Sequence, residues 1–307
     1  MLLIDTPRWP AHGTLYGHLV SDESLWELHE GARAAGLDVR AFDHDHYDLR
    51  ADRVTAALGA GARQVDEREL VRRLRAGGQR ILPAEHAPRR SRARAEVRDQ
   101  VLAVLPRQDS TARALVETVL DRHTVETRRY HDVRHLCEML RTQRRLAESD
   151  GQPMHRTQVL ATLFHDAVHD GVGGQDERRS ADLACELLPT LGLPGSEARE
   201  VERLVMLTVH HQPEADDPVG QHFSDADMAI LASAPGRYHV SVRDIRREYQ
   251  RFDDQDWRRG RRLALTGFLD SPHIFHGATA RRLFEDRARE RVADELAHLE
   301  ASFLEEL

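Results

Sequence analysis

The sequence predicts two domains of different class, a small α/β unit followed by an all-α helical bundle. Over residues 1–80, short apolar runs alternate with amphipathic segments, a pattern typical of strands alternating with helices. From residue 96 to residue 307, apolar residues recur at three- and four-residue spacing almost throughout, which indicates helices. With 307 residues, 40% of them hydrophobic, the chain is long enough to bury two cores.

The N-terminal unit is expected to hold three strands and three helices in alternation. Gly36 and Gly59 are helix-stop signals, and Asp66 is a helix-capping residue. Alternation of strands with helices favours parallel pairing, so a mostly parallel sheet is expected. The expected strands are residues 2–4, 38–42 and 62–65, and the expected helices are residues 22–35, 51–58 and 66–77.

Residues 81–95 are expected to form a linker between the two domains. Pro83 and Pro88 oppose a helix, and arginines crowd the stretch from 89 to 98. The arginine run is expected to be a solvated tether. The alternative is a basic arm that contacts nucleotide phosphates or RNA.

Residues 96–307 are expected to fold as a compact α-helical bundle. Glycine and proline fall mainly between the periodic segments, and the sequence contains no internal repeat. The expected helices are residues 97–104, 111–121, 127–148, 155–170, 177–190, 196–211, 223–233, 238–251, 255–269 and 278–304.

Composition limits the class of protein. A net charge of −8 argues against general nucleic-acid binding. The two cysteines, Cys137 and Cys185, cannot form a disulfide framework, and both are expected to be small core residues in a reducing compartment. No apolar run approaches the ~18 residues of a membrane span, and Asp5 comes too early for a signal peptide. A cytoplasmic protein without a membrane partner is expected.

Histidine and aspartate residues in the second half form a pattern suited to metal binding. His131 and His135 are four apart, so on one helix they project from the same face. His165 and Asp166 end an apolar run, and Asp227 follows later in the chain. Imidazole and carboxylate ligands suit a hard or borderline divalent metal and leave positions for water and substrate. Two exposed histidines on a polar face are the alternative for the first pair.

Residues 96–307 resemble the HD superfamily of metal-dependent phosphohydrolases, and more narrowly a bacterial branch of predicted members. One departure is Asp132, where the branch usually has asparagine. The resemblance rests on Tyr130-His131-Asp132-Val133-Arg134-His135, Phe164-His165-Asp166, Asp176-Glu177-Arg178-Arg179-Ser180-Ala181, Thr208-Val209-His210-His211, Asp225-Ala226-Asp227, Ile245-Arg246-Arg247-Glu248-Tyr249, Gly260-Arg261 and Ala288-Arg289-Glu290, in that order.

The resemblance implies roles for particular residues. The metal ligands would be His135, His165, Asp166 and Asp227, and His131 would be the proton donor to the leaving oxygen. The cofactor would be a divalent metal ion, with Mn, Mg, Co, Ni, Zn and Fe as candidates, and one ion or two are both open. Candidates for support of the developing charge, substrate contact or water orientation are Glu177, His169, His211, Arg246, Arg261 and Arg289.

Several of these assignments have structural alternatives. His169 and Asp170 repeat the HD pair one turn later, and Asp225 competes with Asp227 for the last ligand position. Asp225 would otherwise be a residue at the N-terminus of a helix. Glu177 serves equally as a helix cap, and each arginine serves equally in a salt bridge.

The expected function is therefore hydrolysis of a phosphate ester, of a nucleotide or related small molecule, by metal-activated water. A slow or non-catalytic sensor that binds metal and nucleotide is the alternative from another class, and Asp132 in place of asparagine favours it. An RNA-linked enzyme that uses the arginine run is a third hypothesis. Self-association as a homo-oligomer stays open.

Residues 1–80 resemble domain-of-unknown-function family 4031. The carrying stretches are residues 4–13, 18–22, 27–29, 43–48 and 68–70. The family implies no activity. The residue types suggest a metal or phosphate-ester site at the ends of strands, and a tight polar turn is the alternative. The candidate site residues are Asp5, His12, His18, Asp22, Asp45, His46 and Tyr47.

Overall fold

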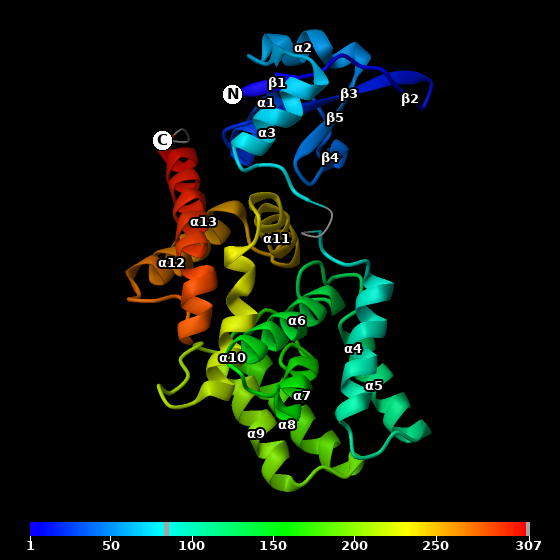
Figure 1. The fold of residues 1–307 in the computed structure, drawn as a ribbon, viewed down its shortest axis with the longest axis vertical. Helices are drawn as coiled ribbons and strands as arrows, with labels where there is room; N and C mark the ends of the chain where they lie inside the picture. The colour runs from blue at the N-terminus through cyan, green and yellow to red at the C-terminus, as the bar shows by residue number, and fades with distance from the viewer. Residues whose placement is uncertain (83–85, 305–307) are drawn as a thin grey trace. The chain divides into compact units, whose positions relative to one another are not determined.

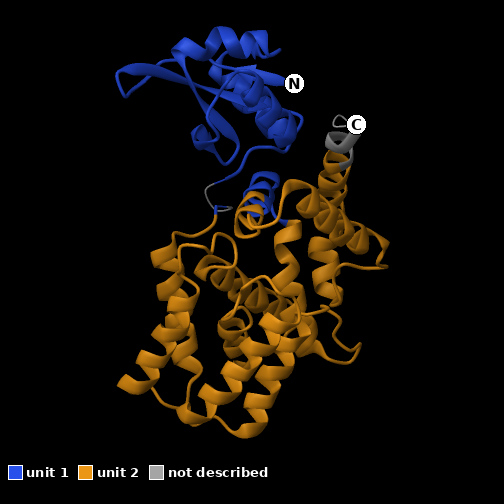
Figure 2. Ribbon diagram, turned by 180° about the vertical axis from the view of Figure 1, so that it is seen from behind, with its two compact units in different colours: residues 1–86, 233–242 blue, residues 87–232, 243–307 orange. Residues whose placement is uncertain are grey.

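The computed structural model describes residues 1–82 and 86–304 of the chain. Two compact units are present, one of residues 1–86 and 233–242 and the other of residues 87–232 and 243–307 (Figure 2). The predicted fold class, a small α/β unit followed by a helical bundle, is confirmed. Residues 83–85 of the expected linker lie outside the described residues.

The elements of the first unit are short (Figure 1). The strands are β1 (Leu2–Ile4), β2 (Trp9–Ala11), β3 (Thr14–Ser21), β4 (Phe42–Asp43), β5 (His46–Arg50) and β6 (Arg63–Gln64). The helices are α1 (Leu25–Ala34), α2 (Val54–Gly59) and α3 (Glu67–Ala76), with the 3-10 turns η1 (Val39–Ala41) and η2 (Ala51–Arg53).

The sheet of the first unit is mixed, whereas the sequence predicted a mostly parallel one. Its strand order is β4-β5-β3-β1-β6, with β2 also paired to β3. Only the β1–β6 pair is parallel; the other four pairs are antiparallel. The difference arises because β2–β3 and β4–β5 are joined by short turns, which permit only antiparallel pairing.

The two faces of this sheet carry separate apolar clusters. Leu19 and Tyr47 face the cluster that α1 and α2 cover, through residues such as Leu28. Val20 faces the other cluster, to which α3 contributes Leu70 and Leu74. Because side chains alternate along a strand, residues in phase with Val20 on β3 share the α3 face.

The second unit is helical (Figure 1). Its helices are α4 (Arg90–Val104), α5 (Ser110–Arg122), α6 (Val133–Ser149), α7 (Arg156–Phe164), α8 (Gln175–Leu187), α9 (Gly195–Leu207), α10 (Pro218–Asp227), the part of α11 (Pro235–Glu248) from residue 243 onward, α12 (Asp254–Asp270) and α13 (Ala278–Leu304), with the 3-10 turns η4 (Leu188–Leu191) and η5 (Met228–Ala232).

Helix α7 is the centre of the helical core. Every side chain from Thr157 to Phe164 is buried, as expected for a helix surrounded by others. The polar Thr162 is accommodated because its hydroxyl accepts from Gln143 at 2.8 Å and donates to the carbonyl of Gln158 at 2.9 Å. A helix this enclosed holds the residues at its end in a fixed position.

Several helix boundaries differ from the sequence prediction, among them those of α6, α7 and α10. α6 begins at Val133 rather than at 127, because the Asp132 carboxylate caps it by accepting the Arg134 N–H at 2.7 Å. α7 ends at Phe164, short of residue 170. α10 runs from Pro218 to Asp227, so Asp225 lies near its C-terminal end rather than at a helix start.

Helix α4 begins at Arg90, inside the segment predicted to be a linker. Two of its arginines form ion pairs within the second unit. Arg90 donates to Asp132 at 2.8 Å, and Arg94 pairs with Glu117 and, at 2.8 Å, with Asp121. The predicted solvated tether is therefore wrong for Arg90 and Arg94, which lie on a helix and form ion pairs within the second unit.

Two further sequence features, the cysteines and the absence of a membrane-spanning segment, can be compared with the structure. Cys137 is fully buried and Cys185 is partly buried, and both are free thiols. Among the described residues, no helix combines the length and apolar character needed to cross a bilayer.

Candidate metal centre

Four side chains converge in the second unit. His135 Nε2 lies 3.2 Å from His165 Nε2 and 3.0 Å from Asp227 Oδ1. His165 Nε2 lies 3.1 Å from Asp166 Oδ2. Two cis ligands each about 2.1 Å from an octahedral metal ion lie about 3.0 Å apart, so these spacings fit a shared divalent cation.

Three helices supply these residues. His135 projects from the first turn of α6, and Asp227 is the last residue of α10. His165 and Asp166 directly follow the buried helix α7. His165 keeps helical dihedral angles as the C-cap residue of α7, and the helix ends after it. Consecutive residues of a helix point about 100° apart, yet His165 Nε2 and Asp166 Oδ2 lie 3.1 Å from each other.

The orientation of the His165 ring is fixed from behind. Its Nδ1 lies 2.9 Å from the carbonyl oxygen of Thr162, so Nδ1 carries the hydrogen and Nε2 faces the cluster. Burial alone lowers the pKa of His165, but the carboxylates of Asp166 and Asp227 outweigh it and raise that pKa to about 9. The group thus sits in a field that favours a positive charge, which a cation would supply in place of a proton.

The two carboxylates experience the reverse effect. Burial raises the pKa of Asp166 and of Asp227, but the surrounding imidazoles hold both well below their usual range. Both carboxylates are therefore ionised in this environment. Ionised, buried oxygen ligands beside two imidazoles form a donor set that suits a divalent metal.

A second group of side chains adjoins the first. His131 precedes α6 instead of sharing a helix face with His135, and the ring centroids of the two are 5.8 Å apart. Its Nδ1 lies 2.6 Å from Glu248 Oε2, and its ring centroid lies 4.2 Å from that of His169. His131, His169 and Glu248 themselves form a cluster with metal-ligand spacing.

Glu248 is the residue that sequence reasoning missed. Its Oε1 accepts the backbone N–H groups of Arg129, Tyr130 and His131, at 2.6, 2.8 and 3.0 Å. Burial raises its pKa, but the hydrogen bond and charge of His131 outweigh this and lower it to about 2. The signal lies in the element Ile245-Arg246-Arg247-Glu248-Tyr249, in which the sequence prediction takes Arg246, two residues earlier, as the functional side chain.

Arg128 is a second buried group that links the two parts of the site. Its side chain donates to the carbonyl oxygen of His131 at 3.0 Å and to that of Asp166 at 2.5 Å. Burial lowers its pKa. The guanidinium therefore ties the segment before α6 to the turn after α7. No sequence signal separated it from the other arginines.

His211 and Asp225 differ in their relation to the cluster. His211 Nε2 lies 3.7 Å from Asp227 Oδ2, and its backbone φ of 50° is left-handed. Asp225 instead accepts the backbone N–H groups of His276 and Gly277, at 2.7 and 2.8 Å. Of the two aspartates that competed for the last ligand position, Asp227 is the one beside His135.

Other predicted site residues are engaged elsewhere. Glu177 accepts the Gly174 N–H at 2.6 Å and so caps α8. Arg246 pairs with Asp254, Arg261 with Glu295 and Arg289 with Glu285. The structure therefore shows the helix-capping alternative for Glu177 and the salt-bridge alternative for the three arginines.

Two different arginines border an open hollow in this unit. Its volume is about 500 Å³, and it is lined by Arg129 and Arg247 together with Glu126, Thr127 and Gln250. Arg129 is next to Tyr130-His131, and Arg247 precedes Glu248. Glu248 binds the Arg129 backbone, so the hollow borders the segment that carries His131.

Asp132, the position at which the sequence departs from the HD-like motif that it resembles, has a local structural role. The carboxylate is fully buried, caps α6, and pairs with Arg90 and Arg134. Aspartate carries a negative charge that asparagine does not, and two guanidinium groups neutralise this charge. The Asp132 carboxylate therefore has a structural use in capping and in charge pairing, and the sensor hypothesis stays an alternative.

The structure also gathers part of the predicted N-terminal set. Asp5 pairs with His18, and Asp45 pairs with His46. The others lie elsewhere: His12 is in an exposed turn, Asp22 pairs with Arg73, and Tyr47 hydrogen-bonds His29 on the opposite sheet face. Asp48, which sequence reasoning passed over, joins His18 and His46.

Comparison with known proteins gives one family match and one similar structure. Residues 2–77 match the family described as a protein of unknown function, DUF4031. The chain is also similar to the crystal structure at 1.45 Å resolution of a predicted HD superfamily hydrolase from an uncultured Thermotogales bacterium. The identity is 19% and the TM-score 0.38, covering 63% of this chain and 91% of that one. No curated protein matches.

Proposed function

We propose that the second unit is a divalent-metal-dependent phosphohydrolase. The observation that carries the proposal is the convergence of His135, His165, Asp166 and Asp227, in which three pairs of donor atoms are 3.0 to 3.2 Å apart and two further pairs are 3.9 Å apart. Buried, ionised carboxylates beside imidazoles have few structural uses that would justify their desolvation. Holding a cation is the use that this donor set fits.

The four ligands would occupy part of an octahedral shell and leave positions for water and substrate. A divalent metal in this position lowers the pKa of bound water and polarises a phosphoryl oxygen. The protein's own contribution is to fix the donors, through the buried helix α7 and the Thr162 carbonyl behind His165.

His131 is suited to donate a proton to the leaving oxygen. Burial lowers its pKa, but the carboxylates of Asp166 and Glu248 outweigh this and raise it. Because Glu248 accepts from Nδ1, the proton on Nε2 is the one available for transfer. Glu248 is then a positioning residue for this donor, acting through His131 rather than on the substrate.

The substrate class follows from the ligands and from the nearby arginines. A phosphate ester supplies hard oxygen atoms for a divalent metal. The hollow lined by Arg129 and Arg247 offers guanidinium groups to the remainder of an anionic substrate such as a nucleotide. These two arginines replace Arg246, Arg261 and Arg289 as our candidates for substrate contact.

The experiment is a metal-dependent hydrolysis screen. The protein is stripped with a chelator, reloaded with Mn, Co, Ni, Mg or Zn, and offered nucleoside mono-, di-, tri- and cyclic phosphates. Asp166→Asn is compared with Asp170→Asn, a matched control whose side chain is 63% exposed. We expect turnover that requires metal, disappears in Asp166→Asn and persists in Asp170→Asn. Metal binding without turnover of any ester would contradict the enzyme assignment and favour a sensor.

A further inference from the structure

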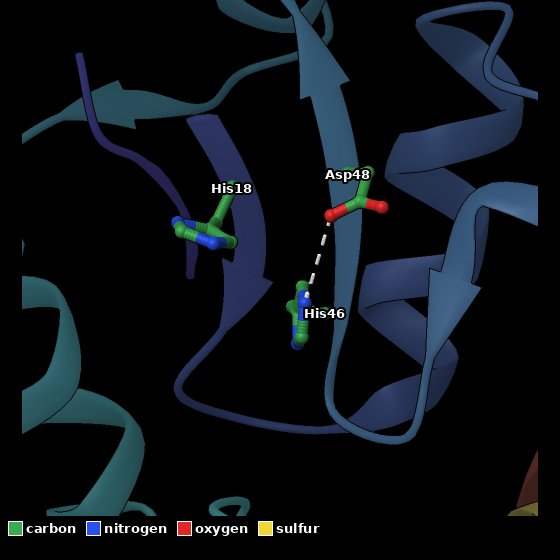
Figure 3. Close-up of side chains that lie close together, drawn as sticks. All are labelled: His18, His46 and Asp48. Carbon is green, nitrogen blue, oxygen red and sulfur yellow. Dashed lines mark ion pairs between the residues drawn. The ribbon is translucent and has the colours of Figure 1, made fainter. Parts of the chain in front are cut away.

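The first unit contains a separate constellation on its sheet. β3 and β5 are antiparallel, and His18 lies directly opposite Asp48 in their register. His46 is two residues before Asp48 on β5, so it points to the same face. Figure 3 shows the three side chains, one from β3 and two from β5, gathered on that face.

The donor atoms of these residues are close enough to share one ion. One ligand atom from each of His18, His46 and Asp48 lies within 4.8 Å of the others. His46 Nε2 is 3.8 Å from Asp48 Oδ1, and the two imidazole ring centroids are 5.1 Å apart at an interplanar angle of 77°. The His46–Asp48 separation of 3.8 Å is within about 1 Å of the spacing of cis ligands around one metal.

Buried carboxylates orient both imidazoles from behind. Asp5 Oδ2 lies 2.8 Å from His18 Nδ1, and Asp45 Oδ1 lies 2.9 Å from His46 Nδ1. Asp5 and Asp45 are each only 2% exposed. A carboxylate on one ring nitrogen fixes the tautomer and raises the basicity of the other, an arrangement common behind metal-bound histidine. In both residues Nε2 is therefore the free donor.

The two carboxylates are themselves held by the fold. Asp5 also accepts the His18 backbone N–H at 2.6 Å. Asp45 accepts the Ile81 N–H at 2.8 Å and pairs with Arg80 at 3.0 Å. Gly17 permits the first contact, because a Cβ there would lie 2.5 Å from Asp5 Oδ1. The positions of the two imidazole rings are thus fixed by residues other than the three that share this face.

An ion could reach this place from solution. The two histidines open onto a cavity of about 330 Å³ beside α3, whose lining also includes Asp5, Asp45 and Arg80. The side chains of His18 and His46 are 30% and 20% exposed, and that of Asp48 is 55% exposed. The site is therefore accessible, whereas a purely structural polar cluster would be expected to be closed.

We propose that His18, His46 and Asp48 form a divalent transition-metal site in the first unit, independent of the cluster in the second. Two imidazoles and one carboxylate favour Zn, Fe, Co, Ni or Mn over Ca or Mg. Three protein ligands leave coordination positions directed at the cavity, where water or a small anion near Arg80 would complete the shell.

The test measures metal binding by the full chain in which the second-unit cluster is disabled by His165→Ala and Asp166→Asn. Cobalt is added to chelator-stripped protein, bound metal is counted after dialysis, and the visible ligand-field spectrum is recorded. We expect one cobalt per chain. Addition of Asp48→Asn should weaken its binding by about 10-fold or more, and addition of His46→Ala should abolish it.

The matched control is Asp52→Asn, the same substitution at a side chain that is 58% exposed, close to the 55% of Asp48. It should leave cobalt affinity unchanged. Because Asp48 is largely exposed, its variant keeps the test decisive even if His46→Ala disturbs folding. The proposal is overturned if the disabled chain binds no cobalt, or if Asp48→Asn binds cobalt as tightly as Asp52→Asn does.

Discussion

Replacement of Glu248 by glutamine should destabilise the protein in a pH-dependent manner. The pKa of this carboxyl is lowered from 4.5 to about 2, and its side chain is only 3% exposed. A shift of that size corresponds to about 3 kcal/mol of stability at neutral pH, at about 1.4 kcal/mol per pKa unit. The ionised group also accepts three backbone N–H groups, which a neutral amide would bind more weakly.

The sign of the pH dependence follows from the direction of the shift. A carboxyl whose pKa is depressed in the folded state stabilises the protein above its unfolded pKa of 4.5. That contribution is lost as the pH falls toward 2. The difference between wild type and Glu248→Gln should therefore be constant from pH 7 to about pH 5 and shrink below about 4.5.

The assay is urea unfolding followed by helical circular dichroism, in chelator, at several pH values. Glu290→Gln is the matched control, since that side chain is 60% exposed and should change stability by less than about 0.5 kcal/mol. The reasoning fails if Glu248→Gln behaves like the control at pH 7. It also fails if the destabilisation does not diminish in acid.

Three further predictions concern ligands, substrate and core. Asp227→Asn should lower the metal affinity of the second unit by about 10-fold or more, while Asp225→Asn should leave it unchanged. Isothermal titration calorimetry measures both affinities, and equal losses would contradict the ligand assignment. Arg247→Gln should raise KM for a phosphate ester with little change in kcat; an unchanged KM would remove the hollow from the substrate site. Leu136→Ala, at a fully buried position, should cost about 2–5 kcal/mol in urea unfolding; a loss under about 1 kcal/mol would contradict its place in the core.

Much of the helical unit was predictable because helix signals are local. Apolar spacing identified the segment containing α7, and the apolar run before His165 indicated a buried helix end. The start of α6 was harder to predict. The residues from Tyr130 to His135 have a spacing that fits a helix, yet the helix begins only at Val133, with Asp132 as its N-cap. Aspartate is a common N-cap residue, so Asp132 was a possible helix start, but the spacing of the two histidines favoured a helix that began earlier.

The first unit was harder because strand pairing is not local. Residues 14–21 form the longest strand, yet Gly17 interrupts their pattern, and the sequence reading placed His18 and Asp22 in loops or at helix starts. The glycine is needed for close approach of Asp5, which no local signal reveals. As a result, the alignment of His18 with Asp48 across β3 and β5 was not foreseen.

The side chains next to the candidate metal cluster were also hard to predict, because they come from distant parts of the sequence. His131 and Glu248 are separated by 117 residues in sequence and joined at 2.6 Å in the structure. The sequence indicated that both segments belonged to one motif set, but it did not tell which side chain faced inward. Arg246 and Glu248 are two apart on α11, and only the packing of that helix decides between them.

The measurement that tests the central claim most directly is turnover against bound metal in a single preparation. Manganese is titrated into chelator-stripped wild type and His165→Ala, and phosphate release and bound metal are determined on the same samples. The account predicts that phosphate release rises with occupancy in wild type and falls by about 100-fold or more in His165→Ala, which also binds one ion fewer. Equal metal binding in both proteins, or phosphate release that does not depend on metal, would contradict it.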